Sequence, residues 1–215
     1  MPPASAESQA DPITILCVDD HPLFLEGIGA VIAHQPDMRL AGTASTAAEA
    51  ITQFMVWRPS LMLLDMRLPD ASGLDVLRAV LGQSPKARIV MLTTYGGDSE
   101  IQRALEGGAF GYLLKHCDHD ELVAAIRAVH AGRKYVPSAV AQTLAQHLGN
   151  ESLTEREMQI LSEVAQGTQN GEMGRRLSIS QDTVKSHLRH ILGKLGAKDR
   201  AEALAIAIRR GIIHF

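Results

Sequence analysis

Short apolar runs alternate five times with amphipathic segments between residues 13 and 132, and this alternation restricts the possible folds most. The runs are rich in Ile, Val, Leu and Met and predict strands at 13–19, 38–45, 60–66, 87–94 and 109–115. The segments between and after them predict helices at 22–35, 46–57, 73–82, 99–108 and 119–132. A helix after every strand is typical of an α/β domain, here a doubly wound five-stranded parallel sheet.

Polar residues follow these apolar runs at positions that should lie together. Asp19 and Asp20 end the first run, Asp65 the third, Thr93 the fourth and Lys115 the fifth. Ligands of doubly wound sheets bind outside the carboxyl ends of the strands, so these side chains should converge on one edge. Three neighbouring carboxylates repel one another unless a hard cation neutralises them, and Mg²⁺ suits oxygen ligands and phosphate chemistry.

The third carboxylate is then available for chemistry. Asp65 could attack phosphorus, because carboxylates form phosphoryl intermediates, and Lys115 could screen the transferring charge. A phosphatase of the aspartyl-phosphate type would need a second acid two residues after its nucleophile, and Arg67 occupies that position. The sequence therefore favours a phosphate acceptor over a dedicated enzyme, with gain and loss of phosphate at Asp65 as its expected chemistry.

The second part of the chain differs in charge. Residues 1–132 carry 9 basic and 16 acidic residues, a net of −7, whereas residues 133–215 carry 12 and 8, a net of +4. The basic part contains four helical segments, and Thr154 with Glu157 forms a capping-box pattern before the first. The third segment, 181–196, follows Ser180 as N-cap and has one apolar face. This pattern predicts an all-α helix-turn-helix domain.

Polar positions on the third segment are the candidate DNA contacts. Lys185, Ser186 and Arg189 lie opposite the apolar face, Thr183 lies in the first turn, and Lys194 lies near the end as a phosphate contact. The alternative is an ordinary charged helix face. The last segment, 199–210, carries Ala201, Leu204, Ala205 and Ile208 at helical spacing, a face that could pack within the domain or pair with a second copy.

Two histidine-containing patterns allow a metal interpretation that we consider weaker. His116, Cys117, Asp118 and His119 are consecutive, and a loop entering a helix cannot easily direct four consecutive side chains at one ion. We expect Asp118 to be an N-cap instead. His187 and His190 flank the apolar face of the third segment, which favours packing or phosphate contact.

The motifs "VDDHP", "LLDMRLPDASGLD", "VMLTTY" and "GYLLK" resemble those of receiver domains of bacterial two-component response regulators. "LTEREMQIL", "ISQDTVKSHLRHILGKL" and "DRAEALAIA" resemble the LuxR-type output domain, so the whole chain resembles the NarL/FixJ family. This chain departs from the family pattern at Gly171 and Gly174, where Lys and Ala are usual. It also departs after Lys115, where many receivers have proline and this chain has His116.

The resemblance implies a flavodoxin-like receiver whose Asp65 accepts phosphate from a cognate sensor histidine kinase. It implies that Asp19, Asp20 and the backbone carbonyl of Arg67 hold Mg²⁺ with Asp65. Thr93 and Lys115 would contact the phosphoryl group, and Tyr112 would be the switch aromatic. It further implies a homodimer, paired through the last helix, on promoter DNA with two-fold related half-sites. A constitutive DNA binder with a vestigial receiver remains a rival.

The expected organisation is a flexible tail at 1–12, a receiver at 13–132, a partly helical linker at 133–150 and a DNA-binding domain at 151–215. The start of the sequence lacks the basic and apolar regions of a signal peptide, and no apolar stretch reaches the ~18 residues that span a bilayer. With two cysteines that form no framework, we expect a bacterial cytoplasmic protein without a membrane partner.

Overall fold

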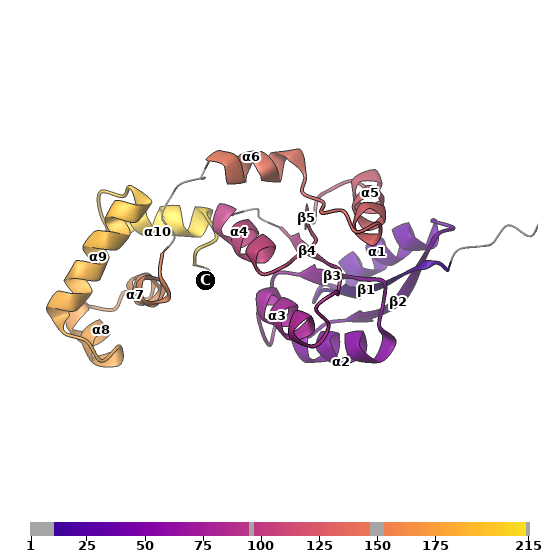
Figure 1. The fold of residues 1–215 in the computed structure, drawn as a ribbon. Helices are drawn as coiled ribbons and strands as arrows, with labels where there is room; N and C mark the ends of the chain where they lie inside the picture. The colour runs from indigo at the N-terminus through magenta and orange to yellow at the C-terminus, as the bar shows by residue number, and fades with distance from the viewer. Residues whose placement is uncertain (1–10, 95–96, 147–152, 214–215) are drawn as a thin grey trace, which may run out of the picture. The chain divides into compact units, whose positions relative to one another are not determined.

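The computed structural model describes residues 11–94, 97–146 and 153–213 (Figure 1). The first ten residues of the expected tail and the last four of the expected linker lie outside these ranges. The chain divides into two compact units, Met1–Thr94 with Ala104–Pro137, and Tyr95–Arg103 with Ser138–Phe215. Within the described ranges, no helix has the length and apolar character to cross a bilayer.

A parallel sheet organises the first part of the chain, as predicted. Its strands are β1 (Ile13–Val18), β2 (Met38–Ala44), β3 (Leu61–Asp65), β4 (Ile89–Thr93) and β5 (Gly111–Leu114), in the order β2-β1-β3-β4-β5. The helices that follow them are α1 (Pro22–Ala33), α2 (Ala47–Trp57), α3 (Gly73–Gln83), α4 (Asp98–Glu106) and α5 (His119–His130). Every predicted boundary in this part lies within two residues of the observed one.

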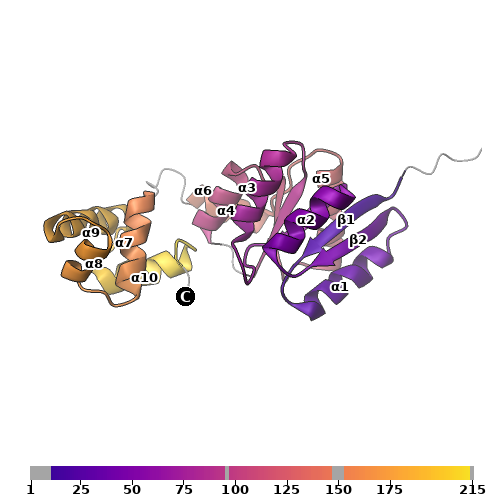
Figure 2. The ribbon, with the colours of Figure 1, turned by 90° about the horizontal axis from the view of Figure 1, so that it is seen from below.

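Helices cover both faces of the sheet (Figures 1 and 2). On one face, α1 and α5 pack against β-strand side chains in a single apolar cluster, which includes Ile15, Cys17, Leu63, Ile32 and Ile126. On the other face lie α2 and α3, whose apolar side chains are also buried. β3 is buried at all five positions, because a central parallel strand is covered on both sides.

The C-terminal unit contains short helices with their own apolar core. They are α6 (Ser138–Gln146), α7 (Glu155–Ala165), α8 (Asn170–Arg176), α9 (Gln181–Leu195) and α10 (Arg200–Arg209). α6 lies inside the segment that we expected to be a partly helical linker. Val184, Leu188, Ile191 and Leu195 form the buried face of α9, as the sequence predicts.

Local signals in the sequence explain where these helices begin and end. Thr154 and Glu157 form the expected capping box at α7, and Gly167, with φ 75°, follows the end of that helix. Ser180 caps α9 by accepting a hydrogen bond from the Thr183 amide at 3.0 Å. Asp118 caps α5 in the same way, from the Glu121 amide at 2.8 Å, as predicted.

Candidate functional site

Two carboxylates are buried at the edge of the sheet where β1 and β3 end. Asp19 follows β1 and is 1% exposed, and Asp65 closes β3 and is 3% exposed. The pairing of β1 with β3 brings these strand ends together, as the sequence predicts. Charged groups are rarely buried to this extent unless they are paired, so the carboxylates require a partner.

Lys115 provides that partner from the end of β5. Its Nζ lies 2.7 Å from Asp19 Oδ2 and 2.9 Å from Asp65 Oδ2, so one ammonium group bridges both carboxylates. Burial raises the pKa of Asp65, and its hydrogen bond from Lys115 only partly offsets this increase. Burial lowers the pKa of Lys115, but hydrogen bonds to Asp19 and Asp65 outweigh it, so that pKa is raised overall. The ammonium form is therefore the one that the site stabilises.

Asp20 and His21 complete the cluster at the mouth of the site. One ligand atom from each of Asp19, Asp20, His21 and Asp65 lies within 4.8 Å of the others. The Nδ1 atom of His21 is 3.1 Å from Asp19 Oδ1 and 2.6 Å from Asp20 Oδ1. The strand-end pattern predicts the three carboxylates but not His21, although His21 directly follows Asp19 and Asp20 in "VDDHP".

These residues fit a hard divalent cation. Three carboxylates supply the oxygen donors that Mg²⁺ prefers. Asp19 Oδ2 is buried and forms an ion pair with Lys115 Nζ at 2.7 Å. A carboxylate oxygen has two lone pairs, so an oxygen that Lys115 contacts can still accept a cation.

The loop after β3 is fixed by Asp70 and Gly73. The two carboxylate oxygens of Asp70 accept hydrogen bonds from the amides of Ala47 and Ala48, at 2.7 and 3.1 Å, and so tie the loop to the start of α2. A Cβ atom on Gly73 would lie 2.2 Å from the Asp65 carbonyl oxygen, so only glycine allows α3 to start there. Arg67 lies in this loop, and its backbone amide donates a hydrogen bond to the Asp65 carboxylate.

Thr93 and Tyr112 lie on the strands next to this cluster. Thr93 ends β4, is 4% exposed, and its carbonyl accepts a hydrogen bond from the Lys115 amide at 2.7 Å. Tyr112 lies on β5, is buried, and is paired with Met91 of β4. The sheet register therefore brings Thr93 to the edge that holds Lys115, as predicted, while the switch role of Tyr112 stays a prediction.

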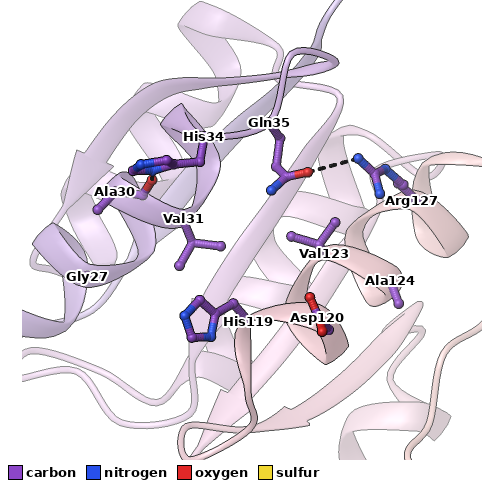
Figure 3. Close-up of a pocket in the computed structure, with 10 residues that line it drawn as sticks. All are labelled: Gly27, Ala30, Val31, His34, Gln35, His119, Asp120, Val123, Ala124 and Arg127. Carbon is purple, nitrogen blue, oxygen red and sulfur yellow. Dashed lines mark hydrogen bonds between the residues drawn. The ribbon is translucent and has the colours of Figure 1, made fainter.

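A hollow of the first unit lies away from this chemistry (Figure 3). It has a volume of about 790 Å³ and lies between α1 and α5, where Val31 and Val123 face each other and Arg127 donates a hydrogen bond to Gln35. None of the strand-end residues lines it. We therefore assign the site from the convergence of charged groups and not from the size of the hollow.

The His116–His119 run forms no metal cluster in the described part of the chain.

In the C-terminal unit, α9 exposes a polar face. Thr183, Lys185 and Arg189 are exposed and Ser186 is half-buried, so these four of the five predicted contacts are accessible. Lys185 Nζ is 3.0 Å from Asp182 Oδ1, an exposed pair that costs little to break. The geometry agrees with a helix that could enter a DNA groove.

Lys194 has a structural contact that the sequence analysis did not anticipate. Its Nζ donates to Glu157 Oε2 at 2.8 Å, and Glu157 is the buried member of the α7 capping box. Burial raises the pKa of Glu157, but hydrogen bonds from Lys194 and Thr154 lower it by more. The pKa of Glu157 is therefore below its ordinary value. Lys194 therefore links α9 to α7, and its predicted phosphate contact stays untested.

α10 turns its predicted pairing face outward. Ala201, Ala205 and Ile208 are exposed and Leu204 is half-buried, whereas Ala203 and Ala207 pack into the domain core. Ile208, at 44% exposed, is one of the few large apolar side chains on the surface. Leu204 packs against the domain core while the other three side chains are exposed, and pairing of this face with a second copy stays a prediction.

Comparison with known proteins places both units. Residues 15–127 match the response regulator receiver domain, and residues 151–207 match the bacterial regulatory proteins of the luxR family. The chain is 36% identical over 205 residues to the nitrate/nitrite response regulator protein NarL of Escherichia coli, covering 91% of this chain and 95% of that protein.

Solved structures agree with the family models. The crystal structure of the response regulator ChrA, from a heme-sensing two-component system, is 31% identical with a TM-score of 0.56 and covers 95% of this chain and all of that one. RcsB from Salmonella enterica serovar Typhimurium, bound to a promoter in the presence of a phosphomimetic, has a TM-score of 0.71 at 22% identity and covers 91% and 98% of the two chains. With its receiver and its LuxR-type DNA-binding domain, the chain belongs to the response regulators of two-component systems, a family of transcriptional regulators.

Proposed function

We propose that Asp65 accepts a phosphoryl group from a cognate sensor histidine kinase and that this modification controls DNA binding by the C-terminal domain. The observation that supports the proposal most is the bridge from Lys115 to Asp19 and Asp65 at 2.7 and 2.9 Å. It leaves a buried carboxylate next to a fixed positive charge, at the edge of a sheet where doubly wound folds bind ligands.

The transfer follows from the positions of these groups. An Asp65 oxygen forms a bond to phosphorus while the bond from phosphorus to the histidine nitrogen of the kinase breaks, and that nitrogen keeps the electron pair. Lys115 would move from the carboxylate towards the new phosphoryl oxygens, and the Thr93 hydroxyl would donate a hydrogen bond to them. Both contacts would stabilise the negative charge on the phosphoryl group as it is transferred.

We infer that Mg²⁺ is the resident cation, held by Asp19, Asp20 and Asp65 with the backbone carbonyl of Arg67. When bound, it supplies neutralising charge to the phosphoryl oxygens. The cluster of carboxylates supports this assignment. We propose no dedicated enzymatic activity beyond the gain and loss of phosphate at Asp65.

The output would be promoter binding by a homodimer in the bacterial cytoplasm. Thr183, Lys185, Ser186 and Arg189 of α9 would contact DNA, and the α10 face of Ala201, Leu204, Ala205 and Ile208 would join two copies. Phosphorylation would bias a receiver equilibrium in which Thr93 and Tyr112 take part, and so shift the DNA-binding population. The accessible polar face of α9 and the exposed apolar face of α10 support this proposal.

Phosphorylation with a small-molecule phosphodonor tests the assignment. We expect the intact mass of the wild-type protein to increase by one phosphoryl group in the presence of Mg²⁺, and DNA affinity to rise with it. Asp65→Asn should gain none, whereas Asp75→Asn, an exposed carboxylate of α3, should behave like wild type. Labelling of Asp65→Asn at the wild-type rate would contradict the phosphoacceptor. Labelling of wild type without any change in DNA affinity would support the vestigial-receiver alternative.

A further inference from the structure

An aromatic ring lies beside the ammonium group that joins the two buried carboxylates. Lys115 Nζ lies over the ring of Phe24, 5.1 Å from its centroid. This distance is within the ~6 Å at which the face of an aromatic ring attracts a cation. Lys115 therefore has two kinds of partner, the carboxylates of Asp19 and Asp65 at 2.7 and 2.9 Å and the face of one ring.

The start of α1 brings Phe24 to this place. Phe24 is the third residue of the helix, and Ile28 and Ile32 follow it at intervals of four residues, which places all three on one face. Ile28 and Ile32 are buried, and Phe24 packs against the same apolar cluster, whereas its neighbour Leu23 is 82% exposed. The core therefore holds the ring, whose position does not depend on Lys115.

The charge of Lys115 benefits from a neighbour that restricts its position. A lysine carries its ammonium group on a flexible four-carbon stem. The side chain of Lys115 is only 12% exposed, and it lines a hollow of about 240 Å³ together with Phe24, Leu92 and Leu122. Attraction between a cation and a ring is stronger where water is excluded, so the ring can contribute more here than it would on an open surface.

We propose that Phe24 is a positioning residue for phosphoryl transfer, because its ring face holds the ammonium group of Lys115 beside Asp65. The proposal rests on the proposed function, since it assumes that Asp65 accepts the phosphoryl group. Phe24 takes no part in the covalent step, in which an Asp65 oxygen bonds to phosphorus as the donor's bond to phosphorus breaks. Its ring limits the positions open to Lys115, so less ordering remains when the phosphoryl oxygens arrive.

Replacement of the ring by an aliphatic side chain tests the proposal. Full-length wild type, Phe24→Leu and Phe24→Tyr are phosphorylated with acetyl phosphate at one saturating Mg²⁺ concentration, and the rate is followed by intact mass. Phe24→Leu should slow the phosphorylation of Asp65 about three- to tenfold. Phe24→Tyr retains a ring face and should stay within about twofold of the wild-type rate.

Fluorination separates the charge distribution of the ring from its bulk. Trifluorophenylalanine incorporated at position 24 nearly keeps the shape of the ring but withdraws electrons from its face, so it should slow phosphorylation as Phe24→Leu does. Nuclear magnetic resonance of the unphosphorylated proteins shows whether the ring stays in place. The ε-methylene protons of Lys115 should be shifted upfield by the ring current in wild type, in Phe24→Tyr and in the fluorinated protein, but not in Phe24→Leu.

Phe110→Leu is the matched control. Phe110 is half-buried, packs against the same apolar cluster and precedes β5, at the other end of that strand from Lys115. This variant should lower the melting temperature as Phe24→Leu does, but keep the upfield shift and a rate within about twofold of wild type. Equal slowing in Phe110→Leu would overturn the proposal. A wild-type rate in Phe24→Leu or in the fluorinated protein would also overturn it, because the ring would then only fill the core.

The outcomes separate this proposal from the proposed function. If Asp65 is phosphorylated at the same rate in wild type and Phe24→Leu, only the role of Phe24 is wrong. If wild type gains no phosphate although Lys115 shows the upfield shift, the phosphoacceptor is wrong and Phe24 has no transfer to assist. If Phe24→Leu loses the Mg²⁺-dependent increase in melting temperature, the ring supports the carboxylates and not Lys115, which contradicts the positioning role.

Discussion

At the scale of single residues, the site balances three carboxylates against one ammonium group. Lys115 pairs with Asp19 and Asp65, which are both buried, whereas Asp20 is 38% exposed and lies next to His21. Without a cation, the charge of Asp20 adds repulsion to a pair that Lys115 has already offset. With a cation bound, the Asp20 carboxylate becomes a ligand and its charge is neutralised. The negative charge of Asp20 therefore destabilises the protein without a cation and contributes to binding when a cation is present.

Asp20→Asn should separate these two effects. We expect the variant to melt a few degrees higher than wild type in a chelator, because removal of one negative charge relieves repulsion. It should also lose most of the increase in melting temperature that Mg²⁺ gives wild type, because a ligand is missing. Thermal melts with and without Mg²⁺ measure both effects. An undiminished Mg²⁺-dependent increase in Asp20→Asn would show that Asp20 is not a ligand.

Residue positions at strand ends could be predicted, whereas contacts made by loops could not. Asp19, Asp65 and Lys115 follow apolar runs, and parallel strands bring their carboxyl ends to one edge whatever the loops do. His21 and Asp70 act through the course of the chain after a strand. The path of a loop cannot be predicted from helix or strand periodicity, so only the structure shows which groups these two residues contact.

At the scale of elements, the clearest departure from expectation concerns the two glycines of α8. Both replace better helix formers of the family, so the sequence predicts a weakened helix. In the structure, Gly171 is exposed with free space around it, whereas Gly174 is buried and its Cβ would lie 2.7 Å from the Ile179 carbonyl oxygen. Gly174 therefore permits the close approach of α8 to the turn before α9.

Alanine at the two positions should have opposite effects. Gly171→Ala should stabilise the C-terminal domain by about 0.4–1 kcal/mol, because the unfolded chain loses freedom and the folded chain has space. Gly174→Ala should destabilise it by about 1–3 kcal/mol, because the turn must move. Circular dichroism measures helix loss, while fluorescence of Trp57, the only tryptophan, reports on the receiver. If Gly174→Ala stabilises as much as Gly171→Ala, the close approach has no energetic importance.

A second element-scale effect is the tie between α9 and α7 through Lys194 and Glu157. Because hydrogen bonds hold the Glu157 pKa below its ordinary value, its contribution to stability is complete above the unfolded pKa of ~4.3 and is lost as the pH falls through the folded pKa. Lys194→Met should destabilise the domain by about 2 kcal/mol at neutral pH, since it leaves a buried carboxylate unpaired.

The difference in stability between Lys194→Met and wild type should narrow as the pH falls through the folded pKa of Glu157 and the carboxylate becomes protonated. Lys185→Met, on the same helix but exposed, should lower stability by less than about 0.5 kcal/mol and instead weaken DNA binding. Denaturant titrations over a pH series and DNA titrations compare the two variants. A pH-independent difference for Lys194→Met would exclude the Glu157 pair as its cause.

At the scale of the whole molecule, the sequence predicts two units because each closes its own apolar core. The cluster around β1, β3 and α5 and the cluster around α7, α9 and α10 share no residue. The acidic and basic parts of the chain follow the same division, which is why composition alone already indicates two different tasks.

Dimerisation on DNA can be tested by changing the exposed face of α10. Two copies joined through this face would place two α9 helices in successive major grooves about one helical turn apart. Ile208 is 44% exposed and has no large role in the core, so Ile208→Glu should leave the fold intact while placing a charge in the dimer interface. Val56→Glu, at a 70% exposed position of α2, is the control for an added surface charge.

The measurement uses fluorescence anisotropy on a duplex selected by wild-type protein from a randomised pool, with one or two half-sites and at several salt concentrations. Ile208→Glu should bind one half-site like wild type and lose the cooperative gain on two, whereas Val56→Glu should keep it. Arg189→Ala should lose about 1–3 kcal/mol already on one half-site and relax preference at particular base pairs if it reads guanine. If Arg189→Ala weakens selected and scrambled duplexes equally, Arg189 contacts phosphate and does not read bases. If Ile208→Glu weakens the single half-site as much as the double one, the α10 face supports its own domain and not a partner copy.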